Sequence, residues 1–309
     1  MTLAIEARGL RRAFGDVVAV DDVDLEVPEG EVLGLVGPDA AGKTTLIRLL
    51  TGVLERDAGT VALFGHDLDA ERDPTRLLLG YMSQAFGLYE DLTVIENIRF
   101  FAAIRRVTAR DRRVREQRLL GFTRLEAFTR RKAGDLSGGM KQKLGLICTL
   151  VHEPRVLFLD EPTNGVDPVS RREFWDILGE LRGRVTVVVA TPYMDEAERC
   201  DRVALMAGGR ILALDAPDAL RAEVHDPVWE VETDRPFLAA EVLGLALPGA
   251  EITLFGDLLH VVGPLEERVV SDVLAAAGQS ARTARIPPTM EDAYVRLAQP
   301  ATARPGEDP

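Results

Sequence analysis

The sequence predicts an α/β protein with a mainly parallel core sheet, followed by a small α+β unit. Strand-like apolar runs alternate with helical patterns between residues 32 and 214, which is typical of layered α/β domains. One run, residues 32–36, is apolar throughout, as expected for a strand buried on both faces. A second series of strand-like runs begins after His225-Asp226-Pro227, which predicts a domain boundary there.

In the first unit, residues 1–224, we expect strands at 4–7, 23–27, 32–36, 60–64, 156–159, 185–190, 203–206 and 211–214. Helices are expected at 43–50, 94–120, 140–151 and 170–181. The opening strands are interpreted as an antiparallel addition. In the second unit, 228–298, we expect strands at 228–233, 251–255 and 258–262 and helices at 269–277 and 290–298. The tail, 299–309, is rich in proline and charge and is expected to be disordered.

Composition restricts the classes of partner. The 309 residues are 46% hydrophobic and carry a formal net charge of -13, so the chain has no overall attraction for nucleic acid. No apolar run approaches the roughly 20 residues that a membrane-spanning helix needs. The first residues lack the basic and apolar regions of a signal peptide. If the protein acts at a membrane, we expect another chain to supply the span.

A phosphate-binding loop is the strongest motif. Residues 37–44 fit G-x-x-x-x-G-K-[ST] between a buried strand and a helix, the context this motif requires. Backbone N–H groups there would point at phosphate oxygens, Lys43 would pair with the β- and γ-phosphates, and the Thr44 hydroxyl would bind Mg²⁺. The predicted ATP-binding loop comprises Gly37, Pro38, Asp39, Ala40, Ala41, Gly42, Lys43, Thr44 and Thr45.

Two acids end the apolar strand at 156–159. Asp160 is predicted to hold Mg²⁺, and Glu161 to act as the general base for water. Farther upstream, Ser137 is a plausible N-cap for the helix at 140–151, and Gly138 and Gly139 would let backbone N–H groups approach an anion. On its own, that second segment also fits a plain capped helix.

Together these segments resemble the ATP-binding cassette (ABC) ATPases. The resemblance covers about residues 3–223: the phosphate loop, the Leu-Ser-Gly-Gly-Met signature and Leu-Asp-Glu-Pro-Thr occur in the family's order. Gln84 matches the glutamine that senses Mg²⁺ and the γ-phosphate, and Asp167 matches the aspartate that bridges to the opposite subunit. Phe14 matches the aromatic that stacks on adenine, although it also fits a packed residue at a strand end.

The resemblance implies a P-loop NTPase cassette with a RecA-like core and antiparallel and helical subdomains. It also implies a head-to-tail dimer, homomeric or heteromeric, with two ATP molecules between the subunits. Ser137, Gly138 and Gly139 would then serve the partner's nucleotide.

Two positions depart from the family pattern. Pro192 stands where the family has a histidine that positions the attacking water, and proline has neither a side-chain donor nor an N–H. Ala40 stands where a glycine is usual, beside an unusual acid, Asp39. If position 40 needs a positive φ, alanine costs about 1–2 kcal/mol there. We hypothesise that the chain binds ATP but hydrolyses it slowly at its own site. The alternative is an active homodimer that relies on Glu161 and Gln84.

The transport interpretation rests on three features: a single cassette, the lack of a long charged insertion, and a C-terminal unit similar to that of bacterial exporter subunits of the multidrug-efflux type. Residues 86–94 also resemble the stretch that meets the integral-membrane subunit, although a solvated loop would fit them as well. These resemblances imply a peripheral subunit at the cytoplasmic face of the membrane. The alternatives are an ATPase acting on ribosomes or nucleic acid and a regulatory cassette that binds ATP without hydrolysing it.

Overall fold

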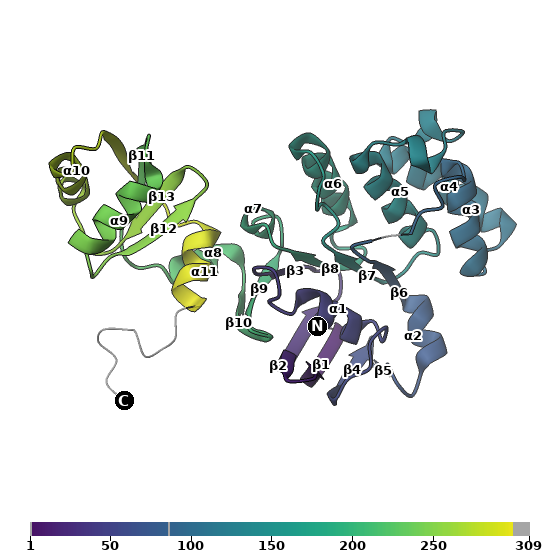
Figure 1. Ribbon diagram of the computed structural model, residues 1–309. Helices are drawn as coiled ribbons and strands as arrows, with labels where there is room; N and C mark the ends of the chain where they lie inside the picture. Colours follow the sequence, from purple (N-terminus) through teal and green to yellow (C-terminus); the bar gives the residue numbers. More distant parts are fainter. Residues whose placement is uncertain (1, 86, 299–309) are drawn as a thin grey trace. The chain divides into compact units, whose positions relative to one another are not determined.

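The computed structural model describes residues 2–85 and 87–298. The chain forms two compact units, residues 1–216 and 217–309 (Figure 1). The division falls before helix α8, Pro217–Ala222, because this helix contacts α11, Met290–Ala298, of the second unit. Phe86 and the tail 299–309, for which we made predictions from the sequence, lie outside the described residues.

The first unit contains a six-stranded sheet in the order β10-β9-β3-β8-β7-β6. The pairings from β9 to β6 are parallel, and β10 is antiparallel to β9, so the predicted mainly parallel sheet is confirmed. Its strands are β3 (Val32–Val36), β6 (Leu79–Met82), β7 (Val156–Asp160), β8 (Thr186–Thr191), β9 (Arg202–Ala207) and β10 (Arg210–Asp215). Every residue of β3, β7 and β8 is buried, which explains their unbroken apolar sequences.

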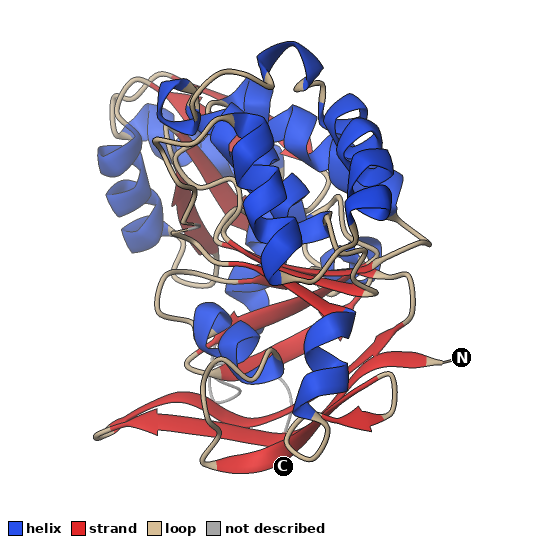
Figure 2. Cartoon of the chain, turned by 90° about the vertical axis from the view of Figure 1, so that its right-hand side faces the viewer, coloured by secondary structure: helices blue, strands red, loops and turns tan. Residues whose placement is uncertain are grey.

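The first unit also contains a four-stranded antiparallel sheet, in the order β2-β1-β4-β5, which includes the first two strands of the chain. In Figure 2 its long strands form a layer along the lower edge of the view. The strands are β1 (Leu3–Phe14), β2 (Val17–Pro28), β4 (Ala58–Leu63) and β5 (His66–Asp67). Its inward side chains and those of β3, β7 and β8 share one hydrophobic core with helix α1, Lys43–Leu50. The phosphate loop, which lies between β3 and α1, is therefore attached to both sheets.

The helices of the first unit differ from the prediction at 94–120, and the short helices Arg72–Leu78 and Met194–Ala197 were not predicted. The helix expected at 94–120 is two helices, because Arg106 has a positive φ of 56° and Thr108 starts a new helix as its N-cap. The helices are α2 (Arg72–Leu78), α3 (Val94–Ile104), α4 (Ala109–Thr123), α5 (Gly138–Leu150), α6 (Pro168–Leu181) and α7 (Met194–Ala197). Helices α3, α4 and α5 contact one another and form the group at one side of the sheet in Figure 1.

The second unit is an antiparallel sheet in the order β12-β13-β11-β14. Helices α9 and α10 pack against it, with Leu243 and Leu274 fully buried in the core. Its elements are β11 (Val228–Thr233), α9 (Pro236–Ala246), β12 (Glu251–Phe255), β13 (Leu258–Val262), α10 (Glu267–Ala276) and β14 (Ala281–Ile286). Strand β14 and helix α9 were not predicted.

Candidate nucleotide-binding site

Strand register gathers the predicted site residues at one edge of the parallel sheet. Val36 of β3 pairs with Thr191 of β8, Asp160 of β7 pairs with Ala190, and Leu159 pairs with Met82 of β6. The loops that begin at residues 37, 83, 161 and 192 therefore leave the sheet at its carboxyl edge. Ligands of open α/β sheets bind at this edge.

The loop at 37–45 is held by backbone contacts. Added Cβ atoms at Gly37 and Gly42 would collide with the carbonyl oxygens of Met206 and Ala19, so both positions require glycine. Gly42 also has a φ of 102°. The Lys43 ammonium donates to the carbonyls of Gly37 (2.7 Å) and Pro38 (2.8 Å). Burial lowers the pKa of Lys43, while Glu161, Asp39 and Asp160 act to raise it.

Ala40 adopts the left-handed conformation, with a φ of 63°. Position 40 therefore does need a positive φ, and an alanine in this conformation costs about 1–2 kcal/mol. The Ala41 N–H donates to the Pro38 carbonyl at 3.2 Å, which closes a turn around Asp39 and Ala40. The side chains of both residues are exposed.

The first of the two acids, Asp160 at the end of β7, contacts the start of α1. The Thr44 hydroxyl donates to Oδ1 of Asp160 at 2.7 Å, and the Tyr81 hydroxyl lies 3.4 Å from Oδ2. Burial raises the pKa of Tyr81, which keeps the phenol protonated as a donor. Asp160 is fully buried. Two of the three residues predicted at the Mg²⁺ site, Thr44 and Asp160, are therefore in direct contact.

The second acid, Glu161, receives two amide donors on one oxygen. Nε2 of Gln84 lies 2.8 Å and Nδ2 of Asn164 3.0 Å from its Oε2. The Glu161 backbone has a positive φ of 49° and is fixed by its N–H, which donates to the Ala190 carbonyl at 2.9 Å. Such strained residues persist where the surroundings determine them, often at functional sites. The contact of Asn164 was not predicted from the sequence.

The turn after β8 is anchored by a buried carboxylate that was also missed. Glu196 is 2% exposed and accepts from the hydroxyls of Thr163 and Thr191, each at 2.6 Å. The Arg171 guanidinium lies 3.6 Å from the same carboxylate and stacks on the Tyr193 ring at 3.9 Å. Pro192, between these anchors, adds no side-chain donor to the edge.

His152 contacts the opposite edge of the sheet. Its Nε2 donates to the carbonyl of Leu79, the first residue of β6, at 3.0 Å. Burial is the main cause that lowers the pKa of His152 to about 4, assisted by the nearby Arg105. An imidazole bound at the amino edge does not replace the missing histidine.

The remaining predicted site residues lie on other elements. Ser137 and Gly138 are exposed at the start of α5, where Ser137 is the N-cap, and Gly139 is buried against Ser170. Asp167 is the N-cap of α6; backbone N–H groups, that of Ser170 foremost, lower its pKa.

Comparison with known proteins identifies this arrangement. An ABC transporter family model matches residues 20–164. The daunorubicin resistance ATP-binding protein DrrA3 of Streptomyces coeruleorubidus is 36% identical over 303 residues, which cover 95% of each chain. The chain belongs to the ABC transporter ATP-binding proteins. The resemblance inferred from the motifs is confirmed.

Other relatives of this ABC protein differ in length or identity. It is 51% identical over 219 residues to the probable multidrug ABC transporter ATP-binding protein YbhF of Escherichia coli, a match that covers 70% of this chain but 38% of the relative. A solved structure of the ATP-binding subunit of an ABC transporter superposes with a TM-score of 0.64 at 28% identity, covering 71% of this chain and 92% of that one. The predicted P-loop NTPase ABC cassette fold is thereby confirmed.

Proposed function

We propose that this ABC protein is the ATP-binding subunit of an exporter and couples ATP binding and hydrolysis to transport through a separate integral-membrane subunit. The names of its relatives, which include multidrug and drug-resistance proteins, support export. Among the described residues no helix is long and apolar enough to cross a bilayer. The proposed location is the cytoplasmic face of the membrane, on the membrane subunit.

The phosphate loop fits a triphosphate chain because its backbone turns around Ala40 and Gly42 toward the start of α1, where N–H groups and the helix dipole favour anions. Lys43 would pair with the phosphates. Thr44, Asp160 and Gln84 fit a Mg²⁺ site, since Mg²⁺ takes few protein oxygens and keeps several waters. When bound, Mg²⁺ would neutralise charge on the phosphates.

In the proposed chemistry, Glu161 accepts a proton from the attacking water. Gln84 and Asn164 fix the orientation of its carboxylate through their bonds to Oε2. Ser137 and Gly138 are exposed at the start of α5, as a surface that binds the partner's nucleotide needs to be. Asp167 is proposed to contact the opposite cassette, which is a second copy or a related chain.

Contacts on the segment at 87–94 support docking of the membrane subunit there. Asn97 is fully buried and bonds to the backbone of Tyr89 at 2.9 Å and 3.0 Å. The Tyr89 side chain stays 48% exposed. Glu90, beside it, pairs with Lys141 of α5 at 3.0 Å. A displacement of this segment would therefore be transmitted to α5, the helix that begins at the Leu-Ser-Gly-Gly-Met signature.

We further propose that the chain's own site hydrolyses ATP slowly. The observation that carries this proposal is Pro192, directly after β8, where the turn is anchored by Glu196 and position 192 itself offers no donor to orient water. Because the signature at Ser137 is intact, the chain could complete an active site on a different cassette. The strain at Ala40 is a smaller second contribution.

Steady-state ATPase rates of the purified protein test this proposal. Pro192→His is expected to raise kcat of the protein alone about tenfold or more, which is a part of the roughly 10²–10⁴-fold that one positioned catalytic group contributes. Glu161→Gln in the Pro192→His background removes the general base and serves as the control. Fast turnover by the wild type that Pro192→His leaves unchanged would contradict the proposal. ATP-dependent dimers without phosphate release would favour the regulatory alternative.

A further inference from the structure

Three side chains share one face at the end of the β1–β2 hairpin. Phe14 pairs with Val17 across the hairpin, and Arg12, two residues before Phe14, lies on the same face because side chains alternate along a strand. Phe14 is 47% and Val17 66% exposed. The Arg12 guanidinium lies over the Phe14 ring, 4.9 Å from its centroid, in cation–π geometry.

An acid directly before β4, Asp57, holds this end of β1. The Asp57 N–H donates to the Arg11 carbonyl at 2.9 Å. Its carboxylate then accepts from the Ala13 N–H at 2.7 Å and from the Arg12 guanidinium at 2.9 Å. The pairing of β1 with β4 ends at Arg11 and Ala58. Beyond that point, the bonds from Asp57 replace the strand ladder and fix the two residues before Phe14.

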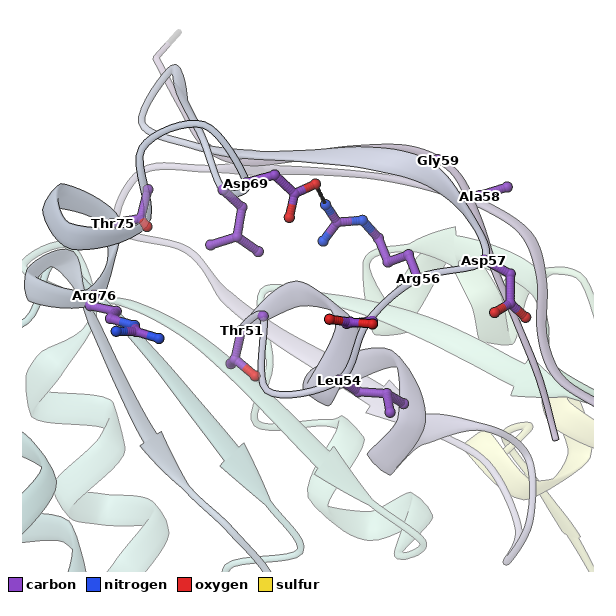
Figure 3. Close-up of a pocket in the computed structure, with 12 residues that line it drawn as sticks. Thr51, Leu54, Arg56, Asp57, Ala58, Gly59, Asp69, Thr75 and Arg76 are labelled. Atoms are coloured by element: carbon purple, nitrogen blue, oxygen red, sulfur yellow. Dashed lines mark hydrogen bonds and ion pairs between the residues drawn. The ribbon is translucent and has the colours of Figure 1, made fainter.

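Arg56, the residue before Asp57, makes a different contact. Asp57 and Arg56 line a polar pocket of about 310 Å³ together with Asp69 and Thr75. Figure 3 shows that Arg56 reaches across this pocket to Asp69, while the Asp57 carboxylate points another way. Arg56 and Asp69 form an ion pair. Asp69 is therefore an acid of the same type as Asp57, whose described ion pair is with Arg56, and it serves as the matched control position.

We propose that Asp57 is a positioning residue for the adenine ring of ATP. It holds Arg12 and Ala13 so that Arg12 covers one face of the Phe14 ring and the exposed part of the ring is presented to the base. This inference rests on the proposed ATP site and on the stacking of Phe14 on adenine, which the family resemblance implies. Asp57 itself acts through β1 and not on the nucleotide.

The expected consequence is a selective loss of base binding. Stacking of a base on an aromatic side chain contributes about 1–3 kcal/mol, which corresponds to roughly five- to 150-fold in affinity. Loss of ring positioning should forfeit part of this contribution. The phosphate loop is held by contacts with Met206 and Ala19, which do not involve Asp57, so phosphate binding should persist.

Calorimetric titration with ATP and with inorganic tripolyphosphate tests the proposal on the full chain. Asp57→Ala is expected to weaken ATP binding about five- to tenfold, with tripolyphosphate affinity unchanged. Asp57→Asn, which keeps an acceptor for the Ala13 N–H, should recover part of the loss. Asp69→Ala should leave both affinities at wild-type values. Unchanged tripolyphosphate binding also demonstrates that the Asp57→Ala protein is folded.

A double-variant cycle separates positioning from general destabilisation. Because Asp57 is proposed to act partly through Arg12, the combined Asp57→Ala and Arg12→Ala changes should weaken ATP binding less than the sum of the single changes. Equal or tighter ATP binding by Asp57→Ala would overturn the inference, as would a parallel loss of tripolyphosphate binding. A wild-type protein that binds neither probe would instead refute the proposed ATP site.

Discussion

The loops that follow β7 and β8 leave neighbouring strands at the same sheet edge, but they differ in the chemistry they present. After β7, Asp160 and Glu161 receive hydroxyl and amide donors from Thr44, Gln84 and Asn164. After β8, the bonds converge on Glu196 inside the protein, and Pro192 at the edge has no donor. Both loops are thus anchored by hydrogen bonds, whereas of the two only the loop at the end of β7 presents side chains that we propose to act on the γ-phosphate and the attacking water.

The largest effect is expected where the reactive loop is changed. Glu161→Gln should lower kcat by at least about 100-fold, because a positioned general base contributes 10²–10⁴, while ATP affinity stays near the wild-type value. Single-turnover ATPase rates with parallel binding titrations measure both quantities. Asn164→Ala, which removes one of two donors to Oε2, should lower kcat several-fold. Wild-type kcat in the Glu161→Gln protein would show that this loop is not the reactive one.

The anchoring of the second loop should appear in stability. Glu196→Ala leaves the buried hydroxyls of Thr163 and Thr191 without their acceptor and is expected to lower the free energy of unfolding by about 3 kcal/mol. Urea denaturation measures this change. Asp195→Ala, at an exposed neighbour, should stay within about 0.5 kcal/mol of the wild type. A loss below about 1 kcal/mol for Glu196→Ala would contradict the anchoring role.

A smaller effect is expected in the phosphate loop. Ala40→Gly relieves about 1–2 kcal/mol of left-handed strain but adds about 0.5–1 kcal/mol of chain entropy in the unfolded state. The net gain in unfolding free energy should be about 0.5–1 kcal/mol, measured by urea denaturation. Ala41→Gly, one residue on and buried, is the matched control and should destabilise. A loss of stability in Ala40→Gly would indicate that the strain is relieved by other contacts.

The smallest effect on catalysis is expected at the opposite edge. His152→Gln should leave kcat unchanged, but it should alter the pH dependence of stability. Burial lowers the pKa of His152 to about 4 from an ordinary 6.5, so the unfolded chain takes up the proton first. The stabilisation is complete above pH 6.5 and is lost as pH falls toward 4, by about 3 kcal/mol in total. Urea titrations at pH 7 and pH 4.5 should therefore give a smaller difference for His152→Gln.

Sequence patterns placed the phosphate loop and the acids Asp160 and Glu161 at one edge of the sheet, because these segments follow or end buried strands and parallel strands align their carboxyl ends. Glu196 was not predicted, since an acid within the charged run at 195–199 gives no sign of burial. Strand β14 carries Arg282 and Arg285 and has no buried residue, so it lacks an apolar signal. Helix α9 is apolar around most of its circumference and shows no helical period.

The positive φ at Arg106 could not be predicted from the sequence either. For this reason α3 and α4 were predicted as one helix. The positioning contacts of Asn164 and Asp57 depend on side chains that meet across a loop or between strands. Such contacts are determined by the packing of the whole unit and produce no recognisable residue spacing in the sequence.

The close approach of Gly37 and Gly42 to Met206 and Ala19 has a mechanical consequence. Ala19 belongs to β2, which forms a hairpin with the strand that ends at Phe14, and Met206 belongs to the parallel sheet. In the proposed ATP site, the surfaces for the base and for the phosphates would therefore keep a fixed separation. We expect any movement that depends on the γ-phosphate to arise instead on the side of Gln84, which bonds to Glu161.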